Sequence, residues 1–116
     1  MVGKRGEIWW ANLRGPIGSE PGYRRPFLIV QDDSYNNTVL RTIIGIVFTG
    51  NLGLAGLPGN VFVSADESGL PKDSVANVTQ LTTTDRMFLS ECVGQLTPET
   101  MERIEKGLLL VLSLKR

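Results

Sequence analysis

Residues 18–33 read GSEPGYRRPFLIVQDD, a polar loop that changes abruptly into an apolar run. The apolar run begins at Phe27, and we expect a buried strand over residues 27–31, because a short apolar segment bounded by turn residues has no face suited to water. Pro26 disfavours the helical region for the residue before it, so Arg25 is expected to be extended. We therefore expect the Arg25 guanidinium to be held at the start of a rigid strand. Preorganised charge of this kind suits a phosphate-binding site.

The segment before this strand is predicted to be a long loop over residues 14–25, because it is rich in glycine and proline. Loops of this length inside compact domains are often functional. The loop offers the hydroxyl of Ser19 and the carboxylate of Glu20 close to Arg25 in sequence.

The chain has 116 residues, of which 41% are apolar, which suits one domain (residues 1–116) with one core. The sequence shows no apolar run long enough to span a bilayer and no signal-peptide core, so we expect a cytoplasmic location. Cys92 is the only cysteine. An intrachain disulfide is therefore excluded, and a reducing compartment fits.

The charges and the missing histidine limit the possible chemistry. Twelve basic residues balance twelve acidic ones, so binding of a polyanion must come from a local patch. Residues 1–41 hold six bases against four acids, which makes this part mildly positive. With no histidine in the chain, histidine acid–base catalysis, Ser-His and Cys-His pairs, and zinc sites with histidine ligands are excluded.

The remaining pattern is one of short strands followed by a helix, which indicates a small β-barrel or an α+β fold. We expect strands over residues 7–13, 27–31, 39–48, 60–65, 74–80 and 88–95. The final segment is predicted to be a helix, with Thr97 as N-cap and Pro98 at the first position. Beyond Leu108 this helix is apolar almost all round, which suggests burial between the barrel and a partner.

Several shorter segments carry their own expectations. Residues 32–37 should form a turn or one helical turn, and Asp85 should cap another short turn. Gly45, inside a strand, suggests a bulge or sharp bend. The glycine-rich residues 50–59 are predicted to be a flexible loop, and the sequence ESGLPKD a turn. The tryptophan pair at positions 9 and 10 is more typical of core or interface packing than of base stacking.

An ordered set of short motifs across nearly the whole chain resembles the MazF/PemK (Kid) toxins of bacterial toxin–antitoxin systems. The matching residues are Arg5-Gly6-Glu7-Ile8-Trp9-Trp10, Gly18-Ser19-Glu20, Arg25-Pro26, Asn36, Phe48-Thr49, Lys72-Asp73-Ser74-Val75-Ala76-Asn77, Gln80 and Thr84-Asp85. The resemblance implies an SH3-like β-barrel with a C-terminal helix, assembled as a homodimer. It also implies a sequence-specific endoribonuclease (mRNA interferase) that cleaves single-stranded RNA without a metal or other cofactor. The implied inhibitor is a MazE-like antitoxin with an acidic, disordered tail.

The resemblance also implies roles for individual residues. RNA cleavage without a metal uses the 2′-hydroxyl of the substrate as nucleophile, so the enzyme must take up its proton and stabilise charge on the phosphoryl oxygens. Arg25 and Thr49 stand at the positions of the family's catalytic arginine and threonine. Glu20 is the candidate general base, and the alternative that it only orients Arg25 is equally compatible with the sequence. Ser19 would hold phosphate or orient the loop, and Arg24 would contact backbone phosphate or remain solvated.

A second group of candidates for contacts with RNA bases or phosphates lies farther along the chain. These residues are Lys72, Asn77, Thr79 and Gln80, which can hydrogen-bond unpaired bases. The Kid-type relatives have an arginine and an aspartate near this strand, where this chain has neither. The pattern therefore places the chain nearer the Arg/Thr type.

Two other functions remain open from the sequence. One is a CcdB-like toxin that shares the barrel but poisons a protein target and is not an enzyme. The other is a plain SH3-like binding module for proline-rich peptides, which normally displays an aromatic groove. The Arg-Pro motif and Thr49 argue against the first, and the placement of the aromatic residues within strands argues against the second.

Overall fold

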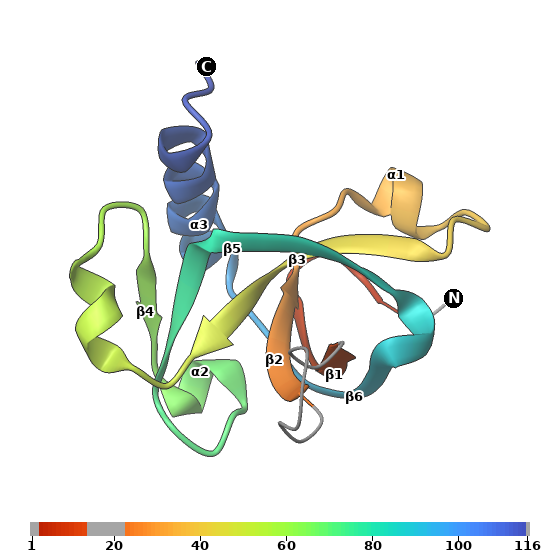
Figure 1. Cartoon of the computed structure of the whole chain (residues 1–116), viewed down its shortest axis with the longest axis horizontal. Coiled ribbons are helices and arrows are strands. Elements are labelled where there is room, and N and C mark those ends of the chain that lie inside the picture. Colours follow the sequence, from red (N-terminus) through yellow and green to blue (C-terminus); the bar gives the residue numbers. More distant parts are fainter. Residues whose placement is uncertain (1–2, 14–22, 116) are drawn as a thin grey trace.

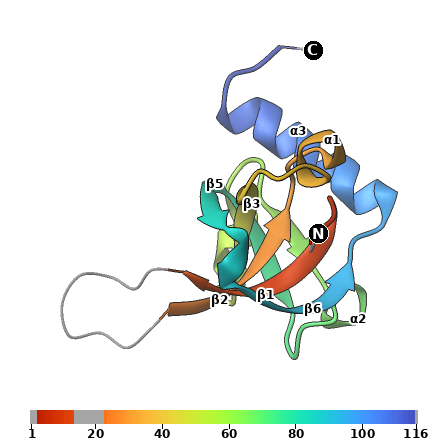
Figure 2. The same cartoon turned by 90° about the vertical axis from the view of Figure 1, so that its right-hand side faces the viewer.

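The computed structural model describes residues 3–13 and 23–115. One antiparallel sheet of six strands, in the order β4-β5-β3-β2-β1-β6, dominates it and curls strongly (Figures 1 and 2). The strands are β1 (Glu7–Leu13), β2 (Tyr23–Ile29), β3 (Thr42–Thr49), β4 (Val61–Val63), β5 (Ser74–Asp85) and β6 (Leu89–Gln95). Helix α3 (Pro98–Val111) packs outside the curl against β4 and β5. The predicted mainly β fold with a C-terminal helix is confirmed, with the barrel in the form of a half-barrel.

Strand β1 lies between β2 and β6 and sets the register of both. It pairs Trp10 with Pro26 and Leu13 with Tyr23, so β2 begins four residues before the predicted start at Phe27. The prediction was wrong here because it followed hydrophobicity, whereas the backbone of the polar residues 23–25 is held by pairing with β1. Both arginines therefore belong to the strand itself and not to the loop before it.

The two faces of the sheet carry separate apolar clusters, as expected from the alternation of side chains along a strand. One cluster packs around Ile8, Leu28, Ile46, Phe48, Val78 and Ile104, and the other around Ala11, Phe27, Ile29, Ile43, Val47 and Leu89. Trp10 packs against the first cluster and Trp9 against the second.

Strand β3 differs from the prediction at its start and at its glycine. It begins at Thr42, and the side chain of Val39, which was placed in the strand, is 93% exposed. A Cβ atom on Gly45 would lie 2.3 Å from Cζ of Phe27 and 2.4 Å from the carbonyl oxygen of Leu28. Glycine is therefore needed because the Phe27 ring packs on the strand, and the bulge lies farther on, between Ile46 and Phe48.

Strand β5 is a single long strand where the prediction ended it at Gln80. Its register against β3 pairs Phe48 with Ala76 but Ile46 with Leu81, so residues 77–80 bulge out of the ladder. The threonine-rich end, residues 82–85, continues the pairing with β3. Asp85 then caps a 3-10 turn, η2 (Arg86–Phe88), by accepting a hydrogen bond from the Met87 amide at 2.9 Å, as predicted.

Three further short helical turns connect the strands. The predicted turn after β2 is α1 (Asp33–Asn36), with Asp32 as N-cap. The predicted flexible loop contains a 3-10 helix, η1 (Leu52–Gly56), because the Asn51 side chain accepts from the Gly53 amide and Asn60 donates to the Leu54 carbonyl. The stretch predicted as the end of a strand and a turn contains α2 (Ala65–Ser68).

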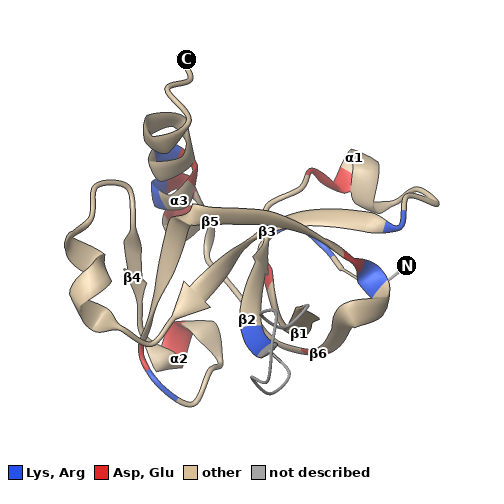
Figure 3. Ribbon diagram, viewed as in Figure 1, with Lys and Arg blue, Asp and Glu red and all other residues tan. Residues whose placement is uncertain are grey.

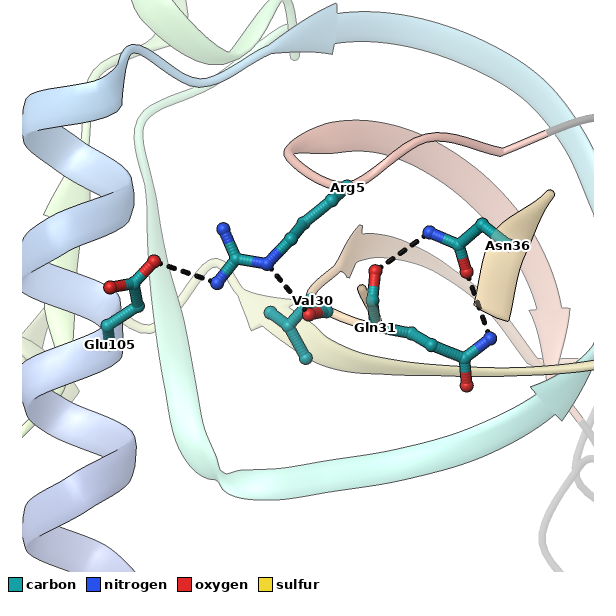
Figure 4. Close-up of polar contacts among 5 residues, drawn as sticks. All are labelled: Arg5, Val30, Gln31, Asn36 and Glu105. Atoms are coloured by element: carbon teal, nitrogen blue, oxygen red, sulfur yellow. Dashed lines mark hydrogen bonds and ion pairs between the residues drawn. The ribbon is translucent and has the colours of Figure 1, made fainter. Parts of the chain in front are cut away.

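Helix α3 begins as predicted, with the Thr97 hydroxyl accepting from the Thr100 amide. The guanidinium of Arg5 ties it to the sheet by an ion pair of 2.8 Å with Glu105 and a hydrogen bond of 3.0 Å to the Val30 carbonyl (Figure 4). Beside this contact, Gln31 and Asn36 bond each other and hold α1 against the end of β2 (Figure 4). In the described part of the chain, no helix is long and apolar enough to cross a membrane.

Candidate active site

A cleft of about 330 Å³ opens between the start of β2, the end of β3 and the segment that leads into β5. Figure 1 shows both strand ends on the side of the molecule that carries α2. The residues that line the cleft are Trp10, Arg24, Arg25, Pro26, Phe48, Thr49, Gly50, Leu70, Pro71, Lys72, Asp73 and Ser74. The floor is therefore apolar and the rim is charged.

The strand register brings Arg25 and Thr49 to the same place. The last pair of the β2–β3 ladder is Phe27 with Val47. Counting two residues outward along each antiparallel strand sets Arg25 against Thr49 on the same face of the sheet. Both residues are half-buried and line the cleft, where the ladder has ended. An extended Arg25 at the mouth of the cleft agrees with the restriction that Pro26 imposes.

The hydroxyl of Thr49 is positioned by the backbone that follows it. Its Oγ1 accepts a hydrogen bond of 3.2 Å from the Asn51 amide, and Thr49 pairs with Val75 of β5. A hydroxyl that accepts in this way keeps its own proton to donate. Thr49 can therefore donate to an oxygen of a molecule bound in the cleft.

The other arginine, Arg24, lies over an aromatic ring. Its guanidinium carbon is 4.4 Å from the ring centroid of Trp10, and its Nη2 is 3.8 Å from a carboxylate oxygen of Glu91 on β6. Arginine stacks on aromatic faces through cation–π attraction and through its flat shape. The stack forms one wall of the cleft.

The opposite wall comes from the segment between α2 and β5. Here Lys72 and Asp73 are exposed, and Asp73 accepts a hydrogen bond of 2.8 Å from the Ala65 amide. Figure 3 shows basic residues on β2 and in the segment that follows α2. Three cationic side chains and one carboxylate line the cleft, so it attracts anions although the chain as a whole carries no net charge.

The structure brings four of the predicted site residues together. Arg24, Arg25, Thr49 and Lys72 share the cleft, whereas Ser19 and Glu20 lie outside the described residues. Lys72 faces the site from a wall that the sequence could not place beside the arginines.

The candidates on β5 lie apart from the lining of the cleft. Asn77 is buried, and its Oδ1 accepts from both the amide and the hydroxyl of Thr79. Thr79 is exposed, and Gln80 lines a second hollow of about 590 Å³ that it shares with residues 81–85. Their predicted contacts with RNA would have to be made outside the cleft.

Asp73 is a carboxylate in the cleft that was not among the candidates. Its only signal in the sequence is its place between Lys72 and Ser74 in the matched motif. Across residues 3–13 and 23–115, no three carboxylate or thiol side chains gather in a way that could hold a metal ion.

Together the half-barrel and its cleft define a small mainly β protein with a cationic candidate site. The chain belongs to the PemK-like, MazF-like toxins of type II toxin–antitoxin systems, whose sequence profile matches residues 4–112. The predicted family is confirmed.

Named relatives and solved structures agree with this assignment. Endoribonuclease MazF6 of Mycobacterium tuberculosis H37Rv is 46% identical over 114 residues, which is 98% of this chain and 100% of that protein. Endoribonuclease EndoA of Bacillus subtilis 168 is 33% identical over 98% of this chain and 97% of its own. The fold matches a MazE–MazF crystal structure from Deinococcus radiodurans with a TM-score of 0.81 at 22% identity, covering 99% of both chains. It matches the M. tuberculosis toxin MazF-mt6 with a TM-score of 0.79 at 21% identity, over 95% of this chain and 99% of that one.

Proposed function

We propose that this chain is the toxin of a type II toxin–antitoxin system and cleaves single-stranded RNA at a short sequence without a metal ion. The observation that carries the proposal is the meeting of Arg25 and Thr49 in one cationic cleft. The names of the relatives, which are 46% and 33% identical, support an endoribonuclease. They also weigh against a non-enzymatic toxin or a peptide-binding module.

In the proposed reaction the 2′-hydroxyl of RNA attacks the adjacent phosphorus, and the bond from phosphorus to the 5′-oxygen of the next nucleotide breaks. The products are a 2′,3′-cyclic phosphate and a 5′-hydroxyl. Negative charge builds on the phosphoryl oxygens as the new bond forms. The Arg25 guanidinium can hold two such oxygens at once, and the Thr49 hydroxyl can donate to one of them. Lys72 suits a neighbouring phosphate as a point charge.

The proton of the 2′-hydroxyl needs an acceptor. We assign this role to Glu20, for which the sequence left open both a general base and a carboxylate that only orients Arg25. Asp73 in the opposite wall is the competing carboxylate. The Asp73 oxygen that accepts from the Ala65 amide is already engaged, which favours a structural role. The two assignments lead to different results when each carboxylate is replaced by its amide.

The partners proposed for this chain are an antitoxin and a second copy. The match to a structure that contains MazE and MazF supports an antitoxin, whose acidic tail would compete with RNA for the cationic cleft. The exposed apolar side chains at and just beyond the end of α3, Leu110, Leu112 and Leu114, support a homodimer. A monomer in sedimentation at micromolar concentration would contradict the dimer. We place the action in the cytoplasm, where its RNA substrates are found.

The test is to incubate a long unstructured RNA with the purified protein in EDTA and to map the cuts by primer extension. Cuts that recur at one short sequence are expected. Loss of cleavage in EDTA with recovery in magnesium would contradict the metal-free mechanism. Intact RNA under all conditions would contradict the proposed activity.

A further inference from the structure

Trp10 and Arg24 form a stacked pair in the wall of the cleft that the stability of the fold does not require. The Trp10 ring is half-buried against the core cluster that contains Phe48, and the flat guanidinium of Arg24 lies over it at 4.4 Å. The ion pair of Arg24 with Glu91 is 3.8 Å long, and both side chains are about half exposed or more, at 49% and 66%. Pairs of this kind contribute little to stability.

The stack lies directly beside the proposed reaction site. Trp10 pairs with Pro26, and the next pair along the ladder is Ala11 with Arg25. Paired residues on neighbouring antiparallel strands have Cα atoms about 4.5–5.5 Å apart. Trp10, Arg24 and Arg25 all line the same cleft, so a nucleotide bound there can meet both the stack and the Arg25 guanidinium.

The surroundings of the stack suit a flat apolar ring. Pro26, Leu70 and Pro71 line the same cleft and carry no hydrogen-bonding side-chain groups. Unpaired RNA bases commonly stack on aromatic rings and on arginine guanidinium planes. Such stacking tolerates any base, because every base has a π face.

We propose that the Arg24 guanidinium, supported by Trp10 and steadied by Glu91, is the stacking platform for an unpaired base next to the scissile phosphate. The base, Arg24 and Trp10 form one continuous stack, which positions the nucleotide so that its phosphate contacts Arg25 and Thr49. The inference rests on the proposed RNA cleavage. It adds that at this nucleotide the presence of a base matters more than its identity.

The experiment is a coupling measurement between Arg24 and single bases of the RNA. The probe is an RNA that carries the mapped cleavage sequence, with a 2′-O-methyl group at the reacting ribose to prevent cleavage. Each nucleotide that flanks the scissile phosphate is replaced in turn by an abasic ribose. Affinity for each RNA is measured with the wild type and with Arg24→Lys, which keeps the charge and loses the plane.

At one of the flanking nucleotides, removal of the base should weaken wild-type binding about tenfold, the usual scale for one stacked base. The same change should have little effect on Arg24→Lys, because the platform has already been lost. Arg41→Lys is the matched control, since Arg41 is exposed and does not line the cleft. It should show the full wild-type loss.

A second variant tests the support under the platform. Trp10→Leu should reduce the effect of base removal in the same way as Arg24→Lys, with circular dichroism as the check on folding. If Trp10→Leu does not fold, the surface variant Arg24→Lys still tests the stacking platform. Equal losses in wild type and Arg24→Lys at every nucleotide would overturn the platform while leaving RNA cleavage intact. Failure of the wild type to bind or cut any RNA would instead overturn the proposed function.

Discussion

Arg25 on β2 and Thr49 on β3 lie on the same face of the sheet. Each is two residues beyond the last pair of the β2–β3 ladder, which joins Phe27 to Val47. The β2–β3 ladder ends before these two residues, and both line the cleft. The rigid strands fix their positions before a substrate binds, which is what stabilisation of a developing charge requires.

Replacement of Arg25 tests the proposed stabilisation of the phosphoryl oxygens. Arg25→Ala should slow RNA cleavage by about 10²–10³-fold, the scale for losing one preorganised donor. Arg25→Lys should recover little of this, because an ammonium group cannot hold two oxygens in a plane. The measurement is single-turnover cleavage of an RNA with one site, with circular dichroism to verify folding. Wild-type rates in both variants would remove Arg25 from the mechanism.

The hydroxyl of Thr49 can be removed without changing the size of the side chain. Thr49→Val should slow cleavage because the donor to the phosphoryl oxygen is lost, whereas Thr49→Ser should keep most of the activity. The comparison also controls for the hydrogen bond that Thr49 accepts from the Asn51 amide, which serine can still accept. Equal activity in Thr49→Val and wild type would leave Thr49 with only that turn-forming role.

The two candidate carboxylates should respond differently to conversion into amides. Glu20→Gln should lower the cleavage rate, because the general base is lost. Asp73→Asn should have a small effect, since an amide oxygen can still accept from the Ala65 amide. The opposite ranking of the two variants would transfer the role of base to Asp73.

The packing of Phe27 on Gly45 gives a prediction about stability. In Gly45→Ala the new methyl group would meet the Phe27 ring at 2.3 Å and a backbone oxygen at 2.4 Å. Overpacking of this kind costs about 1–3 kcal/mol or more of the free energy of unfolding, which urea denaturation would measure. Gly56→Ala is the control, because a Cβ there meets nothing within 4 Å. Equal stability of the two variants would mean that the Phe27 ring moves aside freely.

Most of the fold could be predicted from local patterns. The Thr97–Pro98 start of α3 and the Asp85 cap are local signals, and both were found. The polar start of β2 was missed because pairing with β1 holds its arginines in the sheet. The threonine-rich half of β5 was missed although threonine favours strands and these residues pair with β3. The 3-10 helix in the glycine-rich loop was missed because the prediction followed the glycine content, although the Asn51 cap is a local signal.

The site could be predicted only in part. The sequence suggested Arg25 through the proline that follows it, and the family resemblance suggested Thr49. Their meeting depends on the β2–β3 register, which no local pattern specifies. Asp73 in the opposite wall and the stacking of Arg24 on Trp10 were not predicted. The first depends on the fold that brings the segment before β5 to the cleft, and the second on the β1–β2 register.

The central claim is that this chain directs the 2′-hydroxyl of RNA against its own phosphate. The most direct test uses a DNA copy of the mapped target with a single ribonucleotide on the 5′ side of the scissile phosphate, in EDTA. The account predicts a cut only at that ribonucleotide, with a 2′,3′-cyclic phosphate or the derived 3′-phosphate on the 5′ fragment. The all-DNA strand and the strand with a 2′-O-methyl group at that position should remain intact. A 3′-hydroxyl on the fragment, or cleavage of the all-DNA strand, would contradict the account, because water would then be the nucleophile.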